Sequence, residues 1–192
     1  MKSLAIAALV FPVLLVHAQQ VAMPAVTPAK EATQFDFLVG QWEIEVTPKV
    51  SGLAAMIHGA PRLTGTWKAW RAFDGFGVDD ELRVVDGSGN PIALSHGQRV
   101  YDAKAKRWML ATLDVYRATF AQSSGQWQDG EMRTTGTGTT PEGKATLTRT
   151  RYYEITAERF RMRQDRSTDE GATWEEGVLV IAAKRVAAKA VR

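Results

Sequence analysis

The alternation of apolar and polar residues is most regular just after Gly40. From Trp42 to Val46 the chain reads WEIEV, so an apolar residue stands at every second position. Strict alternation is typical of a β-strand with one buried face and one face in water. We therefore expect a first strand over residues 41–48, with Trp42, Ile44 and Val46 on its inner face.

Short alternating segments recur along the rest of the chain. Turn-forming residues separate them, such as Asp74-Gly75 and the run DGSGNP at residues 86–91. We expect further strands over residues 64–73, 78–85, 92–101, 107–116, 125–133, 144–155, 159–166 and 177–185. About nine strands joined by tight turns predict an all-β fold, a single antiparallel up-and-down meander that removes its exposed edges by closing into a β-barrel.

The first 18 residues have the pattern of a secretory signal peptide. Lys2 supplies a positive charge, residues 4–16 are apolar, and Ala18 suits a cleavage position. The apolar run is too short for a stable membrane span, although an uncleaved anchor is the alternative. We expect an exported protein, periplasmic or secreted, that begins at Gln19 and has no membrane span.

Length and composition indicate one domain after this segment. We expect a flexible leader over residues 19–33, a barrel domain over 34–186 and a tail over 187–192. The net charge is only +3 at pH 7, and basic and acidic residues are interleaved, so we expect no nucleic-acid partner. The chain has no cysteine, which excludes a disulfide framework, thiolate catalysis and Cys-ligated zinc.

Two motifs carry a resemblance to a known family. The stretch FDFLVGQWEI at residues 35–44 sets Gly-x-Trp at the head of the first strand, and SxDxGxTW lies at residues 167–174. In both, the chain resembles an uncharacterised family of secreted bacterial proteins with a lipocalin-like (calycin) barrel, a domain of unknown function. The resemblance implies that Trp42 lies inside one end of the barrel, beneath a basic residue of the last strand, Arg185. It implies no activity.

In lipocalin-like barrels the first loop often folds over the open end as a lid. The connection over residues 49–63 is long and apolar in its middle. It can form such a lid, or it can be a surface loop that packs its apolar residues on the barrel wall. The sequence leaves both arrangements open.

The segment at residues 167–174 also matches the Asp-box of sialidase-type propellers. In this hairpin device the Asp169 carboxylate accepts backbone N–H bonds, Gly171 takes a positive φ, and Trp174 packs back over the turn. A propeller needs several copies, and this chain has one. The motif therefore predicts a structural turn and no glycosidase activity.

Histidine offers little support for metal or haem chemistry. After export only His58 and His96 remain, and a catalytic zinc site usually needs two or three His with a carboxylate. His96 lies on the expected strand over residues 92–101. It can face a cavity as a ligand, or it can be hydrogen-bonded or solvated. We expect no metal site and no cofactor.

The arginines of the C-terminal half are the most unusual feature. Along residues 144–155 the alternation puts Arg149, Arg151 and Tyr153 on one face and threonines on the other. If the threonine face is in water, the arginines point inward and need a paired acid or a bound anion. In the alternative the phase is reversed, or the arginines pair with acids. Examples of such acids are Asp80, Asp114 and Glu131.

Three functions remain open. The first is a protein that binds a small apolar or amphipathic anionic ligand inside the barrel. The second is an enzyme that uses Tyr153, His96 or Asp114 as acid–base groups. The third is a cell-envelope interaction module with a packed barrel. We rank binding first because no nucleophile, acid–base pair or metal set assembles, so no catalytic residue is assigned; the oligomeric state stays open. The expected ligand-binding residues are Arg71, His96, Arg149, Arg151, Tyr153 and Arg166.

Overall fold

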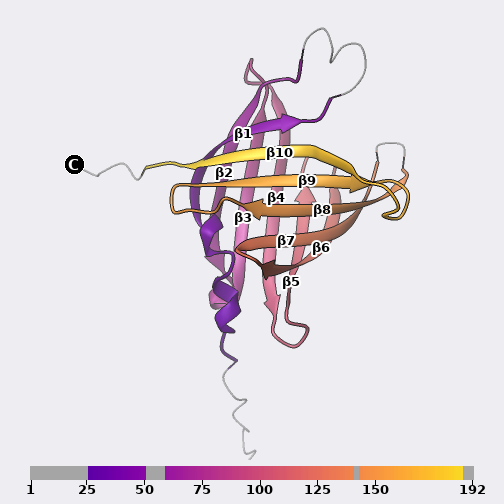
Figure 1. Cartoon of the computed structure of the whole chain (residues 1–192). Helices are drawn as coiled ribbons and strands as arrows, with labels where there is room; N and C mark the ends of the chain where they lie inside the picture. The colour runs from indigo at the N-terminus through magenta and orange to yellow at the C-terminus, as the bar shows by residue number, and fades with distance from the viewer. Residues whose placement is uncertain (1–25, 51–58, 141–142, 188–192) are drawn as a thin grey trace, which may run out of the picture.

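The computed structural model describes residues 26–50, 59–140 and 143–187. Within them, ten strands form one closed barrel in which every strand pairs antiparallel with its neighbours along the chain and β1 pairs with β10 (Figure 1). The strands are β1 (Gly40–Pro48), β2 (Leu63–Ala72), β3 (Gly77–Val85), β4 (Pro91–Asp102), β5 (Arg107–Asp114), β6 (Thr119–Gln128), β7 (Glu131–Thr139), β8 (Ala145–Tyr153), β9 (Arg159–Ser167) and β10 (Glu175–Arg185). The predicted antiparallel barrel is confirmed.

Several predictions fall outside the described residues. They are the signal peptide, most of the leader and of the tail, His58, and the middle of the connection over residues 49–63. Within the predicted leader, residues Lys30–Thr33 form the 3-10 helix η1, and its Ala32 is buried. The packed structure therefore includes residues before Gln34.

One predicted strand proved to be parts of two. The segment over residues 125–133 contains a turn, because β6 ends at Gln128 and β7 begins at Glu131. Asp129 and Gly130 have φ values of 52° and 78°. A type I′ hairpin needs positive φ at both central residues, and Asp-Gly is a favoured pair for it. The count of about nine strands therefore becomes ten.

The ten strands cross in two groups. In Figure 1, β1 and β10 to β7 run across the front, and β2 to β6 pass behind them at a steep angle. Within the second group, Gly65 lets β2 lie close against β3, because a Cβ there would collide with the backbone of Arg83 on β3. A single continuous sheet can therefore close on itself and enclose an interior.

The N-terminal segment plugs one end of this interior. The 3-10 helix η2 (Asp36–Leu38) places Phe35 and Leu38 in the core with no exposed surface. Trp42 is also fully buried, and its Nε1 donates a hydrogen bond to the Leu38 carbonyl at 2.7 Å. The Arg185 guanidinium lies 4.0 Å from the Trp42 ring centre and donates to the Val39 carbonyl at 2.9 Å. This is the contact that the resemblance implied.

Aromatic rings fill the space next to the plug. Phe35 meets Trp108 edge to face at 4.8 Å, and Trp42 meets Phe160 in the same way at 4.8 Å. We call this part of the interior the closed half. Its members, all on the inner wall and all buried, are Trp42, Trp67, Val78, Trp108, Met132, Tyr152, Phe160 and Met162.

Candidate functional site

The rest of the interior differs from the closed half, and strand register identifies its residues. Arg99 on β4 is opposite Leu110, and the pairing continues around the wall through Ser123, Gly136 and Thr148 to Arg166 on β9. Paired residues point to the same face of a sheet. Since Arg99 and Leu110 are buried in the core, the whole row faces inward.

Because barrel strands are tilted, a row of this kind passes from one end of the interior to the other. Arg99 and Leu110 are buried, whereas the inward-facing residues farther along are only partly buried. We call this solvent-reached part the open half. Its inward-facing polar residues are Ser95, Thr112, Asp114, Ser123, Thr148, Gln164 and Arg166, and its partly buried apolar residues include Leu82, Ala93 and Leu179.

The open half has a mixed lining, in which neutral polar groups lie beside apolar ones such as Val46, Val84 and Ile181. The Thr148 hydroxyl donates to the Gly136 carbonyl at 3.4 Å, and the Gln164 amide donates to the Thr150 hydroxyl at 3.4 Å. Bonds of this length are weak, so these groups keep capacity for other partners. The inner wall is therefore not apolar with a single cationic spot. It also carries neutral polar groups.

The predicted inward placement of Arg149 and Arg151 is wrong. The buried residues of β8 include Thr146, Thr150 and Tyr152, so the threonine face is the inner one. Compact hydroxyl side chains fit the inner wall, and the longer guanidinium groups find carboxylates outside. The reversed phase left open by the sequence is the one observed.

The outward arginines are paired with acids. Arg151 donates to both Glu131 carboxylate oxygens, at 2.9 and 2.7 Å, and Arg149 donates to Asp165 at 2.8 Å. Hydrogen bonding and charge from Arg151 hold the pKa of Glu131 below its usual value. Tyr153 also lies on the outer wall, with the Arg151 guanidinium 5.5 Å from its ring centre. None of the three faces the interior.

Arg71 and His96 also lie away from the open half. Arg71 is on an inner position at the plugged end, where it bonds the Asp36 carboxylate and holds η2 in place. His96 is on the outer wall, with its Nε2 3.8 Å from Asp79 and its ring 5.9 Å from that of Trp70. Of the six predicted ligand-binding residues, only Arg166 is on the inner wall of the open half.

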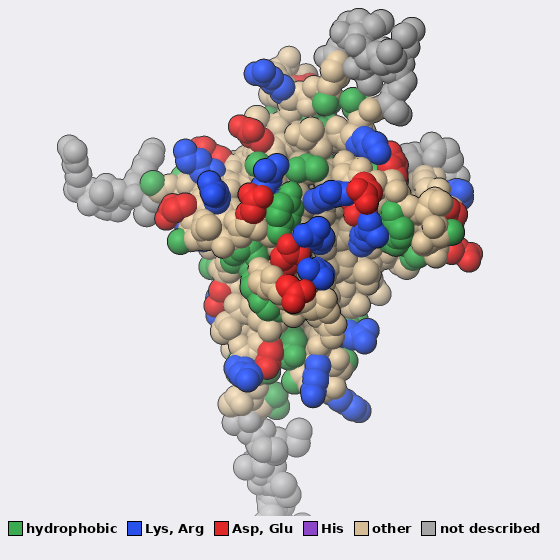
Figure 2. All heavy atoms as spheres, in the orientation of Figure 1, with side chains coloured by type: hydrophobic (Ala, Val, Ile, Leu, Met, Phe, Trp, Pro, Cys, Tyr) green, Lys and Arg blue, Asp and Glu red, His purple; other side chains and the backbone are tan. Residues whose placement is uncertain are grey.

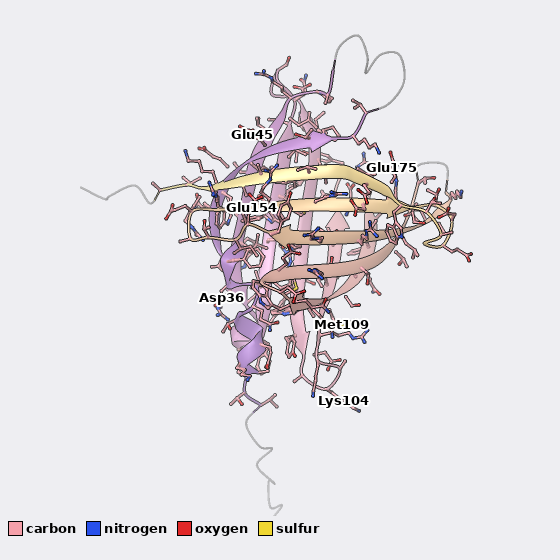
Figure 3. All side chains as sticks on the ribbon, in the orientation of Figure 1. Asp36, Glu45, Lys104, Met109, Glu154 and Glu175 are labelled. Carbon is pink, nitrogen blue, oxygen red and sulfur yellow. The ribbon has the colours of Figure 1, made fainter. Side chains whose placement is uncertain are left out.

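Arg166 lies near the mouth of the barrel, beside the start of β10. Its Nη2 donates to the Glu175 carboxylate at 3.1 Å, and its side chain is 41% exposed. Lys49 approaches the same carboxylate at 3.7 Å. Figure 3 labels Glu175 at the start of β10, next to the β9–β10 turn. Among the described residues, Glu175 is the one acceptor that Arg166 bonds, so this guanidinium can still bond an anion.

Asp114 is the inward-facing acid at the same mouth. Its carboxylate accepts hydrogen bonds from the Arg117 side chain at 2.6 Å and from the Arg117 backbone N–H at 3.1 Å. Burial raises the pKa of Asp114, and the bonds from Arg117 outweigh this effect, so the pKa lies below its usual value. A carboxylate held in its charged form does not suit the acid–base role considered for it.

A buried ion pair that we did not predict separates the two halves. The Arg99 guanidinium contacts the Asp80 carboxylate, and their side chains are only 6% and 4% exposed. Trp67 Nε1 donates to the same carboxylate at 2.7 Å. Gly97 leaves room for the pair, because a Cβ there would overlap Asp80. The signal in the sequence was that Asp80 and Arg99 both occupy inner positions of alternating strands.

The Asp-box forms the turn between β9 and β10. Asp169 accepts hydrogen bonds from the Thr173 hydroxyl at 2.6 Å and its backbone N–H at 2.9 Å, which lower the pKa of Asp169 to about 2. Gly171 has a φ of 92°, and Trp174 donates back to its carbonyl at 3.1 Å. The Arg149 guanidinium covers the Trp174 ring at 4.5 Å. The motif serves as a turn, as predicted.

A groove of about 900 Å³ lies on the outer wall over β1, β2 and β10. Its lining carries both signs of charge, with Glu43 opposite Lys184 and Glu45 opposite Ala182. The groove lies outside the barrel, and no residue predicted to bind a ligand lines it. We therefore place the candidate site in the open half of the interior.

The comparisons with known proteins show the fold and no more. The barrel is similar to the structure of an S-type phycobiliprotein lyase from Guillardia theta, with a TM-score of 0.54, 10% sequence identity and coverage of 81% of this chain and 92% of that chain. The fold is thus lipocalin-like. No protein-family model matches the chain, and no curated protein is significantly similar to it.

Among residues 26–50, 59–140 and 143–187, no helix is long and apolar enough to cross a membrane. In the same part of the chain, no group of three or more His, Cys, Asp or Glu side chains could hold a metal ion.

Proposed function

We propose that this protein is an exported lipocalin-like carrier that binds a small amphipathic anion in the open half of the barrel. Arg166 is the contact for the anionic group. The observation that carries the proposal is the position of this arginine, on the inner wall near the mouth and with one hydrogen-bond acceptor among the described residues. Export rests on the signal-peptide pattern of residues 1–18.

The surroundings of Arg166 suit a ligand of mixed character. Hydroxyl and amide groups of Thr148 and Gln164 can bond polar atoms of the ligand, and Leu82 and Leu179 can contact an apolar part. A charge-assisted bond from a guanidinium to a carboxylate is worth roughly 1.5–3 kcal/mol, or about ten- to a hundredfold in affinity. Glu175 keeps Lys49 as a neighbour when Arg166 turns to the ligand.

The three acid–base groups considered for an enzyme are not placed for that role. His96 and Tyr153 are on the outer wall, and Asp114 is bonded to Arg117 with a lowered pKa. The interaction module requires a barrel that is packed throughout. Packing of this kind is found in the closed half, which aromatic rings fill. Binding in the open half therefore remains the function that we put forward.

The test is a titration of a fluorescent fatty acid and its methyl ester against the wild-type protein, Arg166→Met and Arg151→Met. The two variants make the same substitution, one on the inner wall and one on the outer wall. We expect the acid to bind the wild type and Arg151→Met equally and to bind Arg166→Met about ten- to a hundredfold more weakly. The ester should not distinguish the three proteins.

Two outcomes would contradict the carrier proposal. In one, neither probe binds the wild-type protein. In the other, the acid binds all three proteins with the same affinity, which would remove Arg166 from the site. Thermal melting of both variants shows whether a loss of binding comes from a loss of fold.

A further inference from the structure

A small polar pocket lies at the rim of the plugged end of the barrel, at the opposite end from Arg166. Its volume is about 320 Å³. Figure 3 labels Lys104 in the turn between β4 and β5, at the same end of the molecule as Asp36 of η2. Three parts of the chain line the pocket: Gln34 between η1 and η2, Tyr101 and Lys106 around this turn, and Gln126, Trp127 and Gln128 at the end of β6. We call it the amide pocket, because half of its lining residues are glutamines.

The amide of Gln34 is held with its oxygen toward the core. Its Oε1 accepts the hydrogen bond of the buried Trp108 indole at 3.0 Å. An indole N–H is a donor only, so it fixes which end of the amide faces inward. The Nε2 group of Gln34 bonds no acceptor among residues 26–50, 59–140 and 143–187. Its N–H groups are therefore available to a ligand in the amide pocket.

The other two glutamines form a short chain of hydrogen bonds along the rim. Gln128 Nε2 donates to Gln126 Oε1 at 3.2 Å, and Gln126 Nε2 donates to the Lys106 carbonyl at 3.3 Å. An amide group has two N–H donors, and its oxygen has two acceptor lone pairs. Each of the two side chains therefore keeps one N–H, and each oxygen can accept a further bond. The amide pocket thus presents donors and acceptors side by side.

Aromatic packing holds the walls of the amide pocket in place. The Trp127 ring lies 6.1 Å from that of Phe37 in the plug, and the Tyr101 ring lies 5.7 Å from that of Trp108, edge to face. Both rings are thus anchored on the closed half of the interior. Walls that are already in place reduce the ordering cost of binding a ligand.

Charge gives the amide pocket little preference for an ion. Among the described residues that line it, Lys106 is the one that carries a charge, and it is exposed, so that water and salt screen its ammonium group. On the side that Figure 2 shows, charged side chains crowd over β7 to β10 and are more widely spaced at the plugged end, at the bottom of the view. The lining therefore suits a neutral ligand that both donates and accepts hydrogen bonds.

We propose that the amide pocket binds one ring of a neutral sugar. A sugar hydroxyl donates and accepts at the same atom, so neighbouring hydroxyls match donors and acceptors that lie side by side. A volume near 320 Å³ is at the lower end of the range for ligand sites, which suits a single ring. Gln126 and Gln128 are exposed, so the pocket opens to solvent and can take a free monosaccharide or the end of a longer glycan.

The test is proton–nitrogen correlation NMR of the exported protein, titrated with D-glucose, D-galactose, D-mannose and N-acetyl-D-glucosamine. We expect one or more of these sugars to shift the side-chain amide signals of Gln126 and Gln128 and the indole signal of Trp127. The Kd should be millimolar, because a few neutral hydrogen bonds each contribute little. The methyl glycoside of the sugar that binds is the second probe. Equal binding of the glycoside supports a glycan end as the ligand, and its loss supports the free sugar.

Two rim variants and a matched control locate the site. Gln126→Ala and Gln128→Ala should each weaken sugar binding about three- to tenfold, as expected for the loss of one or two neutral hydrogen bonds. Gln122→Ala removes the same exposed side chain from the same strand outside the pocket, and it should leave the Kd unchanged. Melting curves show that each variant is folded.

Three results would overturn the proposal. In the first, none of the sugars shifts these signals at millimolar concentrations. In the second, a sugar binds the wild-type protein and both rim variants with the same affinity, which would place its site elsewhere. In the third, adenine binds and no sugar does, because a glutamine amide can also bond a planar base. Arg166→Met should leave sugar binding unchanged, so the sugar site and the carrier function stand or fail separately.

Discussion

The closed and open halves of the interior are built from the same strands and treat their polar groups differently. In the closed half the three buried indole N–H groups all have acceptors, at 2.7 Å for Trp42 and Trp67 and 3.0 Å for Trp108. In the open half, the hydrogen bonds donated by Thr148 and Gln164 are long, at 3.4 Å each. The buried indole N–H groups of the closed half are all hydrogen-bonded, whereas polar groups of the open half retain hydrogen-bonding capacity. Stability and ligand binding are thus expected to depend on different residues of one barrel.

The largest effect should come from the closed half. Trp42→Ala removes a fully buried indole together with its bond to Leu38 and its contact with Arg185. We expect the free energy of unfolding to fall by about 3–5 kcal/mol, as is usual for a buried aromatic residue. Trp70→Ala is the control, because that indole is 43% exposed on the outer wall. Urea unfolding of both variants measures the difference, and equal losses would contradict it.

The boundary between the halves gives the second prediction. Arg99→Met leaves the Asp80 carboxylate buried with Trp67 as its remaining hydrogen-bond donor. Breaking a buried pair costs about 3–5 kcal/mol, and we expect about 3 because the indole still bonds the acid. Adding Asp80→Asn removes the stranded charge and keeps an acceptor for Trp67. The double variant should therefore be more stable to urea than Arg99→Met alone, and a double variant that is less stable would refute this reading.

The strands and turns of the barrel could be predicted because their causes are local. Alternation over residues 41–48 and the Gly171 and Asp74-Gly75 turns depend on neighbouring residues alone. Which face of β8 points into the barrel could not be predicted in this way. Both its faces carry residues that can be buried, and alternation does not say which face is inside. The outcome depends on the rings that Tyr152 meets across the closed half, Phe35 and Phe160.

The residues of the candidate site could be predicted only in part, because alternation does not say which face of a strand is inside. Asp80 was predicted as an acid that could pair with an inward arginine, yet its partner is Arg99, on a strand where only His96 was a predicted site residue. Arg166 was predicted beside Arg149, but only Arg166 faces inward. Which arginines share a wall depends on register around a closed barrel, and a single chain read in order does not contain that information.

The smallest expected effect tests the comparison most closely. Met162 and Gln164 are two residues apart on β9 and face the same interior, Met162 in the closed half and Gln164 in the open half. Met162→Ala empties a packed site that is 6% exposed and should cost about 2–3 kcal/mol in unfolding free energy. Gln164→Ala removes one long hydrogen bond from a partly solvated side chain and should cost less than about 1 kcal/mol. Urea unfolding of the two variants shows whether the closed half is packed more tightly than the open half. Equal costs would mean that the open half is packed as tightly as the closed half, which would leave no room for a ligand beside Arg166.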